Sequence, residues 1–193
     1  MDSDALTFIV DHRTPVLDDV ALFLMYVGQS WASVVLVILA ILLITVRNRQ
    51  YSWGVGVCVA AIGAVVVAAA GKAIIDEPRP PFELALVAAR GSAMPSSVAV
   101  LTAAMAVAAV RGWVEPSERG HRRAVLAAVS VVALFGGAVL YLGVHWLSDV
   151  LVGWALGIAV GLAAVPLGRW GAIGLERLLP SVFAWADRFA TDP

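Results

Sequence analysis

Six polar residues that could bind and transform an anion lie at the ends of long apolar stretches: Lys72, Arg79, Ser96, Ser97, His145 and Asp149. Ionisable groups at membrane depth are costly and usually serve a site. A helix that begins after Pro95 would offer free N–H groups and a favourable dipole to an anion. Two cations, this helix start and a histidine oriented by a carboxylate are typical of a phosphate site with a histidine nucleophile.

Each of these residues also has a purely structural interpretation. Lys72 and Asp76 are four residues apart and could pair on one helix face. Arg79 could extend its side chain to lipid headgroups. The two serines could be helix caps only, and Ser148 could cap the last span with Asp149 in its first turn. Taken jointly on one face of the membrane, the residues favour a shared site.

The segments that carry these residues are apolar. Of the 193 residues, 61% are hydrophobic and 14% are charged, and the mean hydropathy is +0.91. A soluble protein of this size cannot bury so much apolar side chain. The single cysteine excludes a disulfide scaffold, and the net charge of −1 gives no indication of a nucleic-acid partner. The sequence therefore predicts an all-α, polytopic membrane helical bundle.

Charge-free intervals mark the spanning helices, each of which needs about 20 apolar residues. Four such intervals cover residues 52–71, 91–110, 124–144 and 150–168. A fifth, 20–46, is too long for one untilted span and breaks at Gly28-Gln29-Ser30, which predicts an interfacial helix over 15–27 and a span over 31–46. We expect five to six transmembrane helices in one domain, 1–193. Its predicted parts are an outer interfacial segment 1–30, a transmembrane core 31–168 and a cytoplasmic amphipathic tail 169–193.

Lysine and arginine are unevenly divided between the two sets of loops. Nine arginines fall in one set and four basic residues in the other. Because the richer set stays in the cytoplasm, residues 1–30, 72–95 and 144–149 are expected on the outer side. The sequence therefore predicts a multi-pass protein of the plasma membrane whose site faces outward.

A stripe of small residues runs along the last predicted span. Gly153, Gly157 and Gly161 recur at every fourth position. Such a face allows helices to approach closely. It could serve packing within the bundle, or it could form the seam of a homo-oligomer.

Three segments, in order, resemble the signature motifs of the type 2 phosphatidic acid phosphatase superfamily. Lys72 with Arg79-Pro80 matches the first motif, and Pro95-Ser96-Ser97 looks like the start of the second, Pro-Ser-x-His. Residues 142–149 look like the end of the third, Ser-Arg-(five residues)-His-(three residues)-Asp. The resemblance covers about residues 6–168. It implies a helical bundle with a pocket at the outer leaflet, no metal or other cofactor, and lipid phosphates or prenyl diphosphates as substrates.

The resemblance also implies a role for each residue. Lys72 and Arg79 would bind phosphate oxygens, and the two serines would help through hydroxyl and backbone N–H groups. His145 would attack phosphorus to give a phosphohistidine. Asp149 would fix the imidazole tautomer and stabilise its positive form. These groups suit phosphoryl transfer, in which positioning and charge stabilisation dominate.

Two positions depart from the family's pattern. Val98 stands where the second motif has its histidine, and Val139 stands where the third has its arginine. The histidine would be the general acid, a contribution of roughly 10²–10⁴-fold. The arginine would stabilise charge on the transferring phosphoryl group. Valine can take neither role.

Several explanations fit these departures. The first is an altered or impaired lipid phosphatase that uses a diphosphate, whose leaving phosphate needs little protonation, or that draws the missing charge from Arg90 or His12. The second is an inactive protein of the same fold that binds or transports a phospholipid or prenyl phosphate. The valines could also have been introduced deliberately. A structural membrane subunit without a ligand is the third function considered. We expect the phosphatase.

Overall fold

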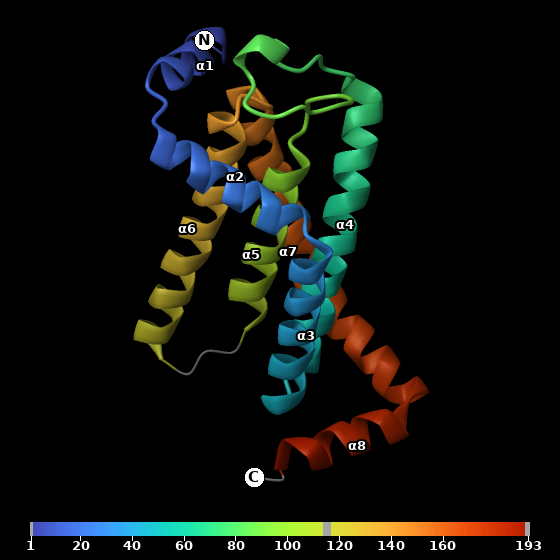
Figure 1. Ribbon diagram of the computed structural model, residues 1–193. Coiled ribbons are helices and arrows are strands. Elements are labelled where there is room, and N and C mark those ends of the chain that lie inside the picture. The colour runs from blue at the N-terminus through green and yellow to red at the C-terminus, as the bar shows by residue number, and fades with distance from the viewer. Residues whose placement is uncertain (1, 114–116, 192–193) are drawn as a thin grey trace.

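A computed structural model describes residues 2–113 and 117–191, and every regular element in these residues is helical (Figure 1). The elements are α1 (Asp2–Asp11), α2 (Pro15–Gln29), α3 (Trp31–Arg47), α4 (Tyr51–Ile75), the 3₁₀ turn η1 (Phe82–Leu84), α5 (Ser97–Gly112), α6 (Glu118–Tyr141), α7 (Leu147–Leu178) and α8 (Pro180–Thr191). The predicted all-α class is confirmed. Met1 of the predicted segment 1–30 and residues 192–193 of the predicted tail lie outside the described residues.

The expected break near Ser30 separates two helices of different direction. Thr14 caps α2 by accepting a hydrogen bond from the Leu17 N–H at 3.4 Å, and Pro15 occupies the first helical position. Ser30 is extended and ends α2. In Figure 1, α2 crosses α6 obliquely, whereas α3 runs along α4.

Helices α4, α5 and α7 pack on one another through small side chains. A methyl group added to Gly153, Gly157 or Gly161 would come within 2.5–2.8 Å of α5 atoms, so each position accepts only glycine. The predicted small-residue stripe is therefore used within the bundle. Because α5 covers this face, the alternative of a homo-oligomer seam through the three glycines is not open to a second copy.

The chain is a multi-pass membrane protein. Helices α4, α6 and α7 are each long and apolar enough to cross a membrane, and the described residues also contain the shorter apolar helices Val35–Arg47 and Ser97–Gly112. Helix α7 continues past the predicted span 150–168 to Leu178. The predicted span ends before Arg169 because a charged side chain is unfavourable in the hydrocarbon of a membrane. The charge does not interrupt the backbone hydrogen bonds of the helix, which therefore continues.

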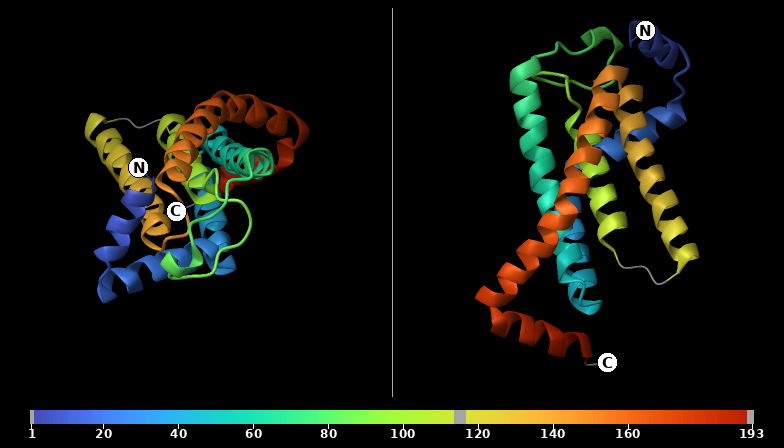
Figure 2. Two further views of the ribbon diagram at one scale, coloured as in Figure 1. Left: turned by 90° about the horizontal axis from the view of Figure 1, so that it is seen from above. Right: turned by 180° about the vertical axis from the view of Figure 1, so that it is seen from behind.

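The bundle has two distinct ends (Figure 2). One end carries α1, the segment 76–96 and the turn between α6 and α7; the other carries the end of α5, the start of α6 and α8. The nine arginines counted in one loop set all lie on elements at or toward the α8 end, whereas Lys72 and Arg79 lie at the other. The sidedness of the chain thus agrees with the loop count, and which end faces outward stays a prediction.

Candidate active site

A buried histidine–aspartate pair lies where α6 turns into α7. The His145 side chain precedes α7, and Asp149 occupies the first turn of that helix, with residue exposures of 6% and 0%. Asp149 Oδ2 accepts a hydrogen bond from the Trp146 backbone N–H at 2.8 Å and lies 3.1 Å from His145 Nδ1. Because an ionised carboxylate only accepts hydrogen bonds, Nδ1 is the donor. The Nε2 lone pair is then available to attack an electrophile.

The surroundings of His145 keep its imidazole uncharged. Burial lowers the pKa of His145 below its ordinary value of 6.5, and the hydrogen bond from Nδ1 to Asp149 raises it in part. The positive charges of Arg79 and Lys72 lower it further. A histidine with a lowered pKa is in its nucleophilic, neutral form at pH 7.

The two cations are both tied to the loop that precedes α5. Lys72 Nζ donates to the carbonyl oxygens of Ser92 at 2.7 Å and Ala93 at 3.1 Å. Arg79 Nε donates to the Gly91 carbonyl at 3.0 Å. The Lys72 ammonium is thus used by the loop, and the alternative pairing with Asp76 is not formed; Asp76 instead ends α4 in a left-handed conformation with φ 46°.

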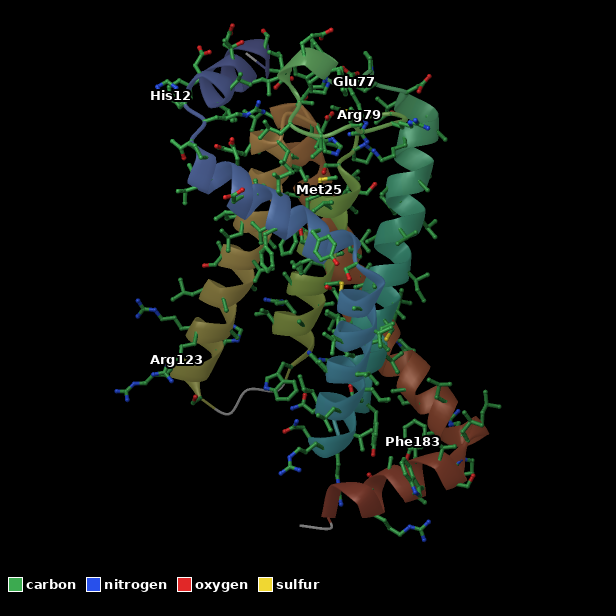
Figure 3. All side chains as sticks on the ribbon, viewed as in Figure 1. His12, Met25, Glu77, Arg79, Arg123 and Phe183 are labelled. Atoms are coloured by element: carbon green, nitrogen blue, oxygen red, sulfur yellow. The ribbon has the colours of Figure 1, made fainter. Side chains whose placement is uncertain are left out.

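Arg79 also links the loop that precedes α5 to the turn that carries His145. Its Nη1 donates to the Val144 carbonyl, one residue before His145, at 2.6 Å. Its hydrogen bonds place the guanidinium between the loop of residues 90–92 and the α6–α7 turn. Figure 3 shows Arg79 at this end of the bundle. Arg79 is thereby held beside the turn that carries His145.

The two serines have different surroundings. Ser96 is fully buried, its backbone N–H donates to the Asp149 carbonyl at 3.1 Å, and its Oγ has no hydrogen-bond partner among the described residues. Ser97, the first residue of α5, is exposed. Ser96 thus joins the histidine–aspartate pair directly, whereas Ser97 makes no hydrogen bond to that pair within the described residues.

The two departures from the family pattern belong to one apolar cluster. Val139 is 8% exposed and packs with Leu142 and Val150, and Val98 packs against the same cluster. Of the residues considered as substitutes, Arg90 has an exposed side chain, although its carbonyl accepts a hydrogen bond from Arg79 Nε at 3.3 Å. The exposed His12 contacts the Phe8 carbonyl through Nδ1 at 2.8 Å, and Figure 3 shows it well apart from Arg79. Within the described residues, no hydrogen bond joins the side chain of Arg90 or His12 to His145.

Sequence reasoning missed the contacts that fix the turn before His145. Arg13 donates from Nε and Nη2 to the Tyr141 carbonyl at 3.1 and 2.7 Å, and the Leu86 N–H donates to the Leu142 carbonyl at 2.9 Å. Gly143 has φ +72°, and a Cβ there would lie 2.5 Å from the Leu84 carbonyl oxygen. In the sequence Arg13 stands directly before Thr14-Pro15, and nothing near it in the chain indicates a contact with Tyr141.

A second missed contact brings α1 onto the start of α7. The Asp2 carboxylate accepts hydrogen bonds from the Ser148 N–H at 3.2 Å and the Ser148 hydroxyl at 2.7 Å. Negative charge is favourable at a helix N-terminus. Ser148 therefore binds α1, and the alternative in which it caps its own helix is wrong, because Trp146 is the N-cap of α7 and Ser148 lies inside the helix. Asp149 does lie in the first turn of α7, as that alternative expected.

Comparison with known proteins identifies the family of the chain and relatives of its fold. The sequence model of the PAP2 superfamily matches residues 51–171, a range that contains all six candidate residues. The crystal structure of Aquifex aeolicus LpxE matches with a TM-score of 0.70 at 21% identity, over 86% of this chain and 94% of that one. The first transmembrane PAP2 type phosphatidylglycerolphosphate phosphatase from Bacillus subtilis matches with a TM-score of 0.68 at 21% identity, over 87% and 84%. No curated protein matches the sequence.

Proposed function

The chain belongs to the PAP2 superfamily, and on that premise we propose that it is a membrane lipid phosphatase that acts through a phosphohistidine at His145. One observation carries the proposal. The imidazole of His145 is buried, its Nδ1 lies 3.1 Å from Asp149 Oδ2, and the positive charges of Arg79 and Lys72 contribute to its lowered pKa. We propose further that this end of the bundle faces outward from the plasma membrane, as the loop charges indicate.

The proposed reaction has two steps. Nε2 of His145 attacks phosphorus, the P–O bond to the lipid breaks, and the lipid leaves with that oxygen. Asp149 stabilises the imidazolium character that develops while it keeps Nδ1 protonated. Lys72 and Arg79 balance the charge on the phosphoryl oxygens, which is the main requirement of phosphoryl transfer. Water then attacks the phosphohistidine and releases inorganic phosphate, which restores the neutral imidazole.

The leaving group decides which lipid suits this site. An alkoxide must be protonated as it leaves, and the position of the expected acid holds Val98, which packs on an apolar cluster. A phosphate monoester needs much less help, since its second pKa is about 6. We therefore propose a prenyl or other lipid diphosphate as the preferred substrate, with a lipid monophosphate as the product that leaves.

A second candidate is a protein of the same fold that binds or transports a lipid phosphate without hydrolysis. Val98 and Val139 favour it, because both lie in or against one apolar cluster and supply neither a proton nor a charge. The cations and the helix start at Ser96 would remain as an anion site. This protein would bind the same lipids but release no phosphate.

The test is phosphate release from purified protein in detergent, with a prenyl diphosphate and phosphatidic acid supplied separately. We expect release from the diphosphate at a rate above that of His145→Ala, and a slower rate from phosphatidic acid. A rate equal to that of His145→Ala on both lipids would leave only binding. Lipid affinity before and after Arg79→Ala then decides between the two remaining functions, since a structural subunit would show no change.

A further inference from the structure

A groove lies between α5, α6 and α7, in the half of the bundle away from His145. This groove has a volume of about 470 Å³, within the usual range for ligand pockets. Apart from Arg111 and Trp154, its lining consists of alanine, valine, leucine and isoleucine. Figure 1 shows α5 and α6 diverging toward this end of the bundle. Its walls belong to apolar helices, so hydrocarbon and not water is the medium that meets it.

The groove is separate from the candidate active site. Buried side chains of Ala138, Val139 and Val150 pack together between them, and Trp154 packs against this cluster. The Trp154 ring closes the groove against α6, because a Cβ on Gly136 would lie 2.5 Å from it. A molecule in the groove therefore cannot reach His145 through the protein.

Arginine side chains flank the end of the groove that lies away from His145. Arg111 is part of the lining at the end of α5. Arg122 is exposed and lies one helical turn before Val125, a lining residue, so it shares that face of α6. Arg123 lies on the opposite face, and Figure 3 shows it directed away from α5. An apolar groove with guanidinium groups at the membrane surface matches a phospholipid with a negative headgroup.

We propose that this groove binds one anionic phospholipid of the leaflet opposite the candidate active site. An acyl chain lies along the alanine and valine side chains, and the phosphate lies between Arg111 and Arg122. The apolar lining accounts for the chain and the two arginines account for the charge. The inference is independent of hydrolysis, since the ligand is neither substrate nor product of the site at His145.

The test measures lipid binding to the purified full chain by native mass spectrometry. Phosphatidylglycerol and phosphatidylcholine with the same acyl chains are titrated in turn. We expect phosphatidylglycerol to bind more tightly, and Arg111→Ala or Arg122→Ala to weaken it about fivefold each, the equivalent of ~1 kcal/mol per arginine. Arg123→Ala, on the opposite face, is the matched control and should leave the affinity unchanged.

A second pair of variants tests the groove itself. Ala128→Trp fills it and should abolish this binding, whereas Ala127→Trp, at an exposed neighbour, should not. Should Ala128→Trp fail to fold, Arg111→Lys provides the check, because it keeps the charge and should retain most of the affinity that Arg111→Ala loses. The proposal is overturned if Arg123→Ala weakens binding as much as Arg122→Ala, or if both lipids bind equally. It is also overturned if Ala128→Trp alters self-association instead of lipid binding.

Discussion

Replacement of Asp149 by asparagine removes the carboxylate charge while it keeps the shape of the side chain. Asp149 Oδ2 accepts both the Trp146 N–H, at 2.8 Å, and the His145 Nδ1–H, at 3.1 Å. An asparagine keeps both hydrogen bonds by placing its carbonyl oxygen there, because an amide nitrogen at this position would face the Trp146 N–H donor. The substitution therefore keeps the imidazole tautomer and removes the negative charge that stabilises a positive imidazole.

The size of the effect follows from the 3.1 Å separation of His145 Nδ1 and Asp149 Oδ2. At an effective dielectric constant of about 20, unit charges at this distance attract by about 5 kcal/mol. Loss of that stabilisation from a transition state with a positive imidazole slows the reaction about 10⁴-fold. The same substitution in a Ser-His-Asp triad has a similar effect, roughly 10⁴-fold in kcat.

The assay is phosphate release under single-turnover conditions, with acid-labile phosphoprotein measured in parallel. We expect Asp149→Asn to lower both by about 10⁴-fold while thermal unfolding in detergent changes little. His145→Ala sets the background. If Asp149→Asn keeps more than about a tenth of the wild-type rate, the charge of Asp149 does not stabilise the imidazole, and that proposed role is wrong.

Three further predictions follow from the site. The pKa of His145 lies below 6.5, because burial and the charges of Arg79 and Lys72 lower it more than Asp149 raises it. We therefore expect kcat/KM to stay high as the pH falls to 6.5 and to decrease only below that pH. A decrease that begins at or above pH 6.5 would contradict this. Val98→His with Val139→Arg should raise hydrolysis of phosphatidic acid by roughly 10²-fold or more, and raise that of a diphosphate less; equal gains would mean that the leaving group is not limiting. Gly143→Ala should destabilise the fold by about 1–3 kcal/mol and lower activity, because of its φ of +72° and the 2.5 Å approach to Leu84, whereas Gly137→Ala, with open space around its Cβ, should do neither in thermal unfolding.

Local patterns in the sequence predict much of the fold. The absence of charged residues over 52–71 predicted most of α4. The break at Gly28-Gln29-Ser30 predicted the boundary between α2 and α3. These features depend on neighbours along the chain, since hydropathy and helix caps act over a few residues. The end of α7 was not predictable from charge, because a helix can leave the membrane without ending.

The sequence predicted a shared site because its residues lie at the ends of apolar stretches on one face of the membrane, but direct contacts were predictable only between residues that are close in sequence. His145 and Asp149 are four residues apart across a helix start, so their contact could be expected. Arg13 and Tyr141, separated by 128 residues, meet only because α1 and α2 fold back over α6. The hydrogen bonds from Lys72 and Arg79 to backbone carbonyls were also not predictable, because every residue type has a carbonyl and the sequence does not indicate which one is used.

Those carbonyls have a consequence for how an anion would be received. An ammonium has three N–H donors, and Lys72 directs them at two carbonyls, of Ser92 and Ala93, in the described part of the chain. Arg79, with five donors, is braced by the carbonyls of Gly91 and Val144. Each cation is thus aligned in advance by the protein's own dipoles while it retains protons to give. A phosphoryl group arriving here would meet a preorganised cradle and would not need to gather two long side chains out of free rotation.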